Sequence, residues 1–162
     1  MRLDGQAIVV GDDVDTDVIF PARYLAVLDR KQQAKHLFEP LGAEFKERLD
    51  RSTVLAAGWN LGCGSSREHA VTSMIGHGVR FVVAKSYARI FFRNAINIGL
   101  PVVESPELAA AIADGAAVDV DLAAGIGSTG GTSYRFEPLP PALLEILTAG
   151  GLWARRAKRT AA

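Results

Sequence analysis

The sequence predicts an α/β fold, because short apolar strands alternate with helical patterns through the middle of the chain. The chain has 162 residues, of which 49% are hydrophobic and 22% charged, as in an ordinary globular protein with one core. We expect one domain over residues 1–162, with a more β-rich C-terminal part.

The first half of the chain contains two predicted strands and two predicted helices. Residues 6–10 form a β-branched run that ends at a Gly-Asp-Asp turn. Apolar residues recur every four positions in 41–50, which predicts an amphipathic helix. A buried strand at 54–57 runs into the glycine-rich stretch 58–64, and a helix follows at 67–75, closing at nearby glycines.

The second half continues the alternation. A strand at 81–84 precedes a helix over 87–97, for which Ser86 is the expected cap. A second capped helix, at 106–113, begins after Ser105 and follows a strand at 102–103. The remaining elements are two strands around a glycine-rich turn and a last helix, at 117–122, 132–136 and 142–149. The basic tail from about Trp153 is expected to be frayed and solvated.

The composition excludes several classes of protein. Eighteen basic and eighteen acidic residues balance, so no overall positive field would hold a nucleic acid or an anionic membrane. A single cysteine excludes an internal disulfide or a four-thiolate metal site. Neither a signal peptide nor a membrane span is recognisable, so we expect a cytoplasmic protein.

The segment 58–68 is the most informative part of the chain. Its glycines stand between a strand and a helix, where they let the backbone bend and a ligand approach. Ser65 and Glu68 have the spacing of a capping box, and the helix start would direct free N–H groups into the loop. Arg67 adds a guanidinium suited to a carboxylate. This chemistry predicts a small-anion site, although a capped helix after a tight turn is an equally good interpretation.

The two serines of this segment suggest different roles. Backbone amides and an arginine are the groups that lower the pKa of a hydroxyl, so Ser65, at the bend, is the candidate general base. Ser66 is then free to bind a substrate carboxylate. No adjacent histidine could activate a nucleophile, which disfavours acyl transfer.

Other motifs carry less weight. The glycine-rich segment 125–130 matches a dinucleotide fingerprint, but strand-like residues follow it, so we interpret it as a hairpin turn. The acidic run 12–17 lacks the spacing of a calcium loop and is interpreted as a turn with solvated aspartates, of which Asp17 is the best candidate for orienting a neighbour. Cys63, near a helix start, is expected to be somewhat acidic. The scattered histidines suggest no metal site.

Five blocks together resemble the aconitase swivel-domain family, and within it most closely the small subunits of 3-isopropylmalate dehydratases. They are G-D-D-V-D-T-D-V-I at 11–19, P-A-R-Y-L at 21–25, G-C-G-S-S-R-E-H-A at 62–70, A-K-S-Y-A-R-I-F at 84–91 and R-N-A-I-N at 93–97. The resemblance covers residues from about 5 to 140. It implies the swivelling β/β/α fold of aconitases, as a single domain.

The resemblance also implies an activity. The reaction would be a hydro-lyase isomerisation of 2-isopropylmalate to 3-isopropylmalate, in leucine biosynthesis, with a separate large subunit that carries a [4Fe–4S] cluster as Lewis acid. Ser65 matches the proton-abstracting serine, and Gly64, Ser66 and Arg67 match the substrate-binding positions. Thr16 and Asp17 match a supporting pair. This chain is expected to bind no cofactor or metal itself.

The segment 26–28 lies where related enzymes read the side group of the substrate. Ala26, Val27 and Leu28 are apolar and suit an alkyl group better than a third carboxylate, which would require a cationic partner. A 2,3-dimethylmalate dehydratase fits this argument nearly as well, and a homoaconitase remains an alternative. A non-catalytic anion-binding module, which keeps the loop as a structural cap, is the alternative from another class.

Overall fold

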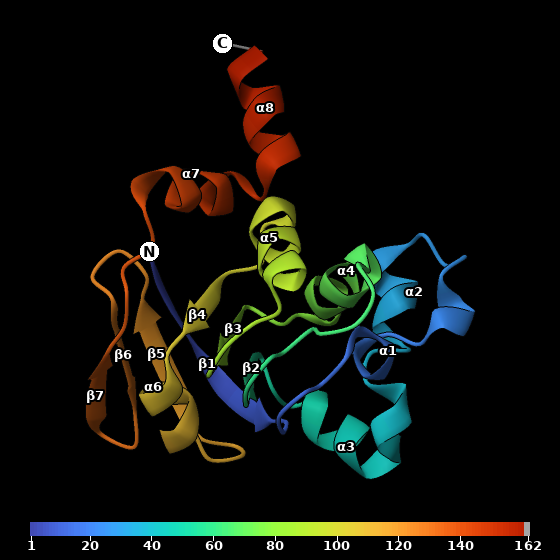
Figure 1. Cartoon of the computed structure of the whole chain (residues 1–162), viewed down its shortest axis with the longest axis horizontal. Coiled ribbons are helices and arrows are strands. Elements are labelled where there is room, and N and C mark those ends of the chain that lie inside the picture. The colour runs from blue at the N-terminus through green and yellow to red at the C-terminus, as the bar shows by residue number, and fades with distance from the viewer. Residues whose placement is uncertain (161–162) are drawn as a thin grey trace.

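Seven strands form one mixed sheet in the computed structural model, which describes residues 1–160 (Figure 1). The strand order is β4-β3-β2-β1-β5-β6-β7. The strands are β1 (Arg2–Val9), β2 (Val54–Ala57), β3 (Phe81–Ala84), β4 (Val102–Glu104), β5 (Ala117–Asp121), β6 (Ile126–Thr129) and β7 (Thr132–Arg135). The predicted α/β class is confirmed.

Strand β1 joins a parallel and an antiparallel half of the sheet. Its second half pairs parallel with β2, from Ala7 opposite Val54, and β2, β3 and β4 continue in parallel. Its first half pairs antiparallel with β5, which continues into β6 and β7. All four residues of β2 and of β3 are buried, as expected for central parallel strands covered on both faces.

Helices cover the sheet and extend from its ends. They are α1 (Thr16–Ile19), α2 (Arg30–Ala34), α3 (Gly42–Leu49), α4 (Glu68–His77), α5 (Arg89–Ile98), α6 (Pro106–Ala111), α7 (Pro141–Ala149) and α8 (Leu152–Thr160), with 3-10 turns at Ala22–Tyr24 and Glu39–Leu41. Figure 1 shows α4 and α5 beside the parallel strands, and α6 beside the antiparallel ones. None of the helices within 1–160 is long and apolar enough to cross a membrane.

Three expectations about local structure are wrong. Segment 125–130 is mostly strand β6, with turns on either side, because Gly127 and Thr129 face inward and pair with β5. Ser86 does not cap α5, since its hydroxyl instead accepts the N–H of Asn60. The basic tail is not frayed up to residue 160: it forms α8, where Arg155 pairs with Glu145 of α7, and its last two residues lie outside the described part.

Helices α2 and α4 pack against each other closely at a glycine. A Cβ added to Gly76 of α4 would lie 2.1 Å from the carbonyl oxygen of Arg30 in α2. Because that neighbour is backbone, it can move away only if α2 itself moves. The residue therefore fixes how near the 20–35 segment lies to α4.

Replacement of Gly76 by Ala should lower the free energy of unfolding by about 1–3 kcal/mol, because the added methyl group overpacks the contact between α2 and α4. Denaturant unfolding of the full chain measures the change. Gly11→Ala is the matched control, since a Cβ added at that residue would have nothing within 4 Å of it. Equal stability of the two variants would contradict this packing.

Candidate active site

The loops that carry the predicted site residues follow three neighbouring parallel strands. The segments 10–15, 58–67 and 85–88 leave the carboxyl ends of β1, β2 and β3, which are adjacent in the sheet. This edge is where ligands bind in open α/β sheets. The topology thus brings together the two blocks that the sequence analysis singled out.

The acidic segment is bonded to the glycine-rich loop rather than only solvated. The carboxylate of Asp12 accepts the N–H of Trp59 at 2.8 Å, and that of Asp13 accepts the side-chain amide of Asn60 at 2.9 Å. Asp15 caps α1 by accepting the N–H of Val18. Asp12, Asp13 and Asp17 are exposed, as the interpretation of a turn with solvated aspartates expects, but each of these carboxylates also has a specific partner.

Thr16 holds the backbone of the serine loop. It is 2% exposed, its N–H donates to the carbonyl of Cys63 at 3.0 Å, and its hydroxyl donates to the carbonyl of Ser65 at 3.0 Å. These bonds engage only main-chain atoms of the loop. The side chains of Ser65 and Ser66 are both left exposed to solvent.

The sharp bend of this loop depends on glycine. Gly62 has φ +79°, and a Cβ there would lie 2.2 Å from Cγ of Phe91 in α5. An L-residue would therefore be strained in conformation and would also clash with a buried ring. At Gly62 the loop therefore packs directly against Phe91 of α5.

Asp17 and Arg67 form a two-point ion pair across the site. Nη1 of Arg67 donates to Oδ1 of Asp17, and Nη2 donates to Oδ2 at 2.8 Å. Nη1 also donates to the carbonyl of Phe20 at 3.3 Å. The Arg67 side chain is 11% exposed, whereas Asp17 is 56% exposed. Arginine has five N–H donors. Three are engaged here, which leaves two for a ligand.

The capping box expected between Ser65 and Glu68 is absent. Helix α4 begins at Glu68, its N-cap is Arg67, and no side chain caps it. Backbone N–H groups at an uncapped helix start are available to a ligand, together with the positive end of the helix dipole. The free N–H groups on which the anion-site interpretation depends are therefore present. The side-chain cap on which the capped-helix alternative depends is not formed in the described residues.

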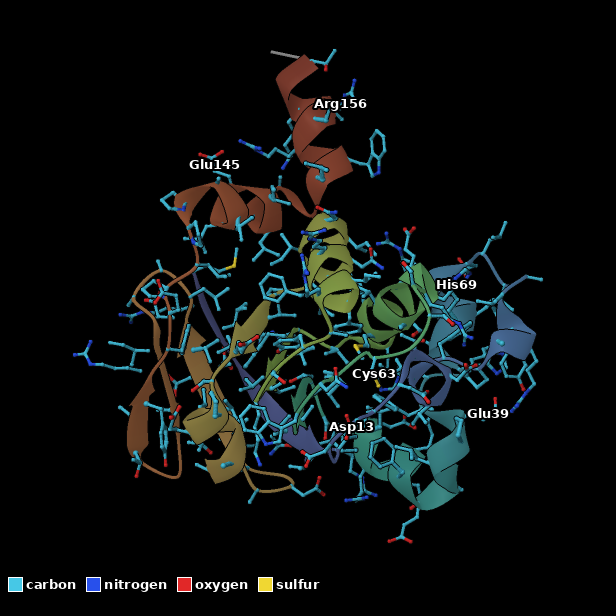
Figure 2. The ribbon with its side chains drawn as sticks, viewed as in Figure 1. Asp13, Glu39, Cys63, His69, Glu145 and Arg156 are labelled. Atoms are coloured by element: carbon cyan, nitrogen blue, oxygen red, sulfur yellow. The ribbon has the colours of Figure 1, made fainter. Side chains whose placement is uncertain are left out.

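Cys63 is not an activated thiol. Its Sγ lies 3.5 Å from the carbonyl of Asp13, and the two residues lie together in Figure 2. Burial raises the pKa of the Cys63 thiol, and the carboxylates of Asp15 and Asp13 add to the effect. The expectation of a somewhat acidic thiol is wrong, because burial, followed by the nearby carboxylates of Asp15 and Asp13, disfavours the thiolate.

The 26–28 segment precedes α2, which packs against α4, and Leu28 lines a pocket together with Glu68, His69 and Thr72. Ala26 and Leu28 are exposed, and Val27 is half-buried. Two interactions fix the preceding turn: the ring of Tyr24 stacks on His36, and its hydroxyl donates to Glu39 at 3.0 Å. Nothing in the sequence patterns had indicated these contacts, because they join residues up to fifteen positions apart across irregular backbone.

The comparisons with known proteins agree with this geometry. A mixed α/β sheet, with the predicted site residues at the carboxyl ends of its parallel strands, defines the class, and the family model of the aconitase C-terminal domain matches residues 14–107. The chain belongs to this family, within its branch of 3-isopropylmalate dehydratase small subunits. The protein of that name from Thermodesulfovibrio yellowstonii is 46% identical to this chain, over 96% of this chain and 95% of that protein. The one from Archaeoglobus fulgidus is 49% identical, over 91% of this chain and 92% of that protein.

A solved structure confirms the fold. The crystal structure of a 3-isopropylmalate dehydratase from Methanocaldococcus jannaschii superposes with a TM-score of 0.90 and 39% sequence identity, covering 99% of this chain and 96% of that one. The resemblance stated from the sequence motifs is therefore confirmed, and so is the aconitase-type fold.

Arg67→Met should raise the pKa of Asp17 toward the ordinary carboxyl range, because the hydrogen bonds from Arg67 are the main cause of its lowered pKa. In the wild type, the stability that this pair contributes is complete above the ordinary pKa of a carboxyl and is lost as pH falls through the lowered pKa of Asp17.

Titration of the carboxyl groups by NMR measures this shift. Arg51→Met, which removes an exposed arginine, is the control and should leave Asp17 unchanged. An unmoved pKa of Asp17 in the Arg67 variant would show that the pair does not form in solution.

Proposed function

We propose that this chain is the small subunit of a cytoplasmic 3-isopropylmalate dehydratase, which interconverts 2-isopropylmalate and 3-isopropylmalate in leucine biosynthesis. The observation that carries the proposal is a pair of exposed serines, Ser65 and Ser66, in a loop whose backbone is bonded by Thr16 and which leads into Arg67 and an uncapped helix start. The names of its relatives supply the substrate, and the site supplies groups for binding carboxylates and moving a proton.

Ser65 is proposed as the general base. In dehydration, a base removes a proton from the carbon next to a carboxylate while the hydroxyl on the neighbouring carbon leaves as water. Addition of water with the two positions exchanged completes the isomerisation. A serine oxygen can accept that proton only if negative charge on it is stabilised, which the amides at the start of α4 and the guanidinium of Arg67 would do.

Gly64, Ser66 and Arg67 are proposed to bind the substrate carboxylates. The two free donors of Arg67, the hydroxyl of Ser66 and the backbone at Gly64 would surround a single anionic group. Asp17 is proposed to orient Arg67 through its two-point contact, and Thr16 to hold the loop, so that both act through their neighbours.

A large subunit is the proposed partner. Ser65 and Ser66 are exposed on this chain, so a second protein is needed to exclude water from the reaction. Trp59 and Ile90 flank the serine loop with exposed apolar side chains, 48% and 51% exposed, which supports docking on this face. The substrate would then lie between the two subunits.

The iron–sulfur cluster implied by the family does not fit this chain. Its one cysteine has a thiol pKa raised by burial, and within residues 1–160 no three His, Cys, Asp or Glu side chains gather as a metal site. We therefore assign the cluster to the proposed partner and route no step of this chain's chemistry through it.

Ser65→Ala should reduce the turnover of the reconstituted complex by about 10²–10⁴-fold, because general-base catalysis typically contributes that much. Assembly and substrate binding should persist. Steady-state kinetics on the two-chain complex measure the loss, with Ser133→Ala, an exposed serine of β7, as the matched control. Turnover near the wild-type value would mean that Ser65 has only a structural role.

Arg67→Lys should mainly raise KM, because a planar fork with several donors becomes a single point charge. The KM for 3-isopropylmalate in the complex measures this, and the exposed Arg51→Lys is the control. An unchanged KM would argue against Arg67 as a carboxylate ligand. A panel of alkylmalates in the same assay separates the isopropylmalate enzyme from a dimethylmalate dehydratase or a homoaconitase.

A further inference from the structure

The side chain of Gln33 connects the 26–28 segment to α4. It is 3% exposed and, together with Ala34, forms the buried face of α2. Its Nε2 donates to the carbonyl of Val27 at 2.8 Å, and its Oε1 accepts the hydroxyl of Thr72, which is 7% exposed, at 2.6 Å. One buried amide therefore uses both its donor and its acceptor to join a loop carbonyl to a helix.

The two residues that Gln33 joins, Val27 and Thr72, lie on segments that carry different parts of the proposed site. Thr72 lies on α4, the helix that begins directly after Arg67. Val27 lies in the middle of the segment proposed to read the substrate side group. A pocket of about 330 Å³ adjoins this connection, lined by Leu28, Arg30, Gln33, Glu68, His69 and Thr72.

We propose that Gln33 is a positioning residue that sets the distance between the 26–28 segment and the Ser65–Arg67 site, and thereby the preference for the substrate side group. The inference rests on the proposed function. Gln33 acts through Val27 and Thr72 rather than by contact with the reacting atoms. It determines how well a bulky alkyl group is packed.

The chemistry of the amide explains why few residues could replace Gln33. Gln33 supplies the donor for the carbonyl of Val27 and the shortest acceptor contact for the hydroxyl of Thr72, which also lies 3.3 Å from the carbonyl of Glu68. Loss of the amide therefore removes the partner of a half-buried carbonyl. Glutamate has nearly the same shape but, when ionised, only accepts hydrogen bonds, so it would repel the carbonyl of Val27. Valine at position 72 would remove only the second bond.

The decisive experiment compares substrates within each variant of the two-chain complex. Gln33→Glu and Thr72→Val are assayed on 3-alkylmalates carrying a methyl or an isopropyl group. The ratio of kcat/KM for isopropyl over methyl should fall by about tenfold in Gln33→Glu, because the packing of two carbon atoms is lost. The ratio should fall less in Thr72→Val, which keeps the bond to Val27. Gln32→Glu, on the exposed face of α2, should leave it unchanged.

The ratio does not depend on how much enzyme is folded, so partial misfolding of a variant does not obscure the result. Activity of the wild-type complex on 3-isopropylmalate tests the proposed function separately. If the wild type is active and the ratio in Gln33→Glu equals that of the wild type, even with lower overall activity, Gln33 is merely structural and the inference is overturned.

Hydrogen exchange in the isolated full-length chain gives a second readout, independent of activity. The N–H of Val27 donates to the carbonyl of Tyr24 at 2.9 Å. In Gln33→Glu, exchange across 25–29 should accelerate by about tenfold, because the loop loses its bond to the buried amide. Exchange as slow as in Gln32→Glu would contradict the proposed anchoring.

Discussion

The candidate site depends on the connection between the segment after β1 and the loop after β2. A loop that contains three glycines between a strand and a helix has no intrinsic reason to keep one conformation. Here Thr16 bonds the carbonyls of Cys63 and Ser65, and Asp17 holds Arg67 at two points. Because these bonds use the backbone and the arginine, the serine side chains stay free to react.

The same arrangement explains why the chemistry is divided between two proteins. A sheet edge that presents its functional groups to solvent cannot by itself exclude water, which weakens every electrostatic contribution to catalysis. The chain supplies a pre-arranged half of the proposed site: a proposed base, proposed carboxylate ligands and a segment proposed to read the side group. A covering surface must then come from another protein, which matches the naming of its relatives as small subunits.

Much of the fold was predictable because local patterns and tertiary structure agree. Strands 54–57 and 81–84 were expected at the bounds that the structure shows, since continuous apolar runs between turn residues have few other solutions. The motif residues of the candidate site were selected from their chemistry and family resemblance. The partners of these residues could not be predicted in the same way. The pairing of Asp17 with Arg67, for example, spans fifty residues and has no local sequence signal. The caps expected at Ser65 and Ser86 failed because both residues lie in loops whose conformation is set by long-range contacts. Helix α2, with five residues, is too short to show a periodic pattern.

A double-mutant cycle between Thr16 and Ser65, measured as kcat of the two-chain complex, tests the central claim most directly. If Thr16 acts by holding the Ser65 loop, Thr16→Val lowers kcat by about tenfold in the wild-type background, as expected for one lost hydrogen bond to the backbone of the proposed base, and has no further effect once Ser65 is alanine. An equal loss in both backgrounds would show that the two residues act independently, and the account of a site held together by the segment after β1 would then be wrong.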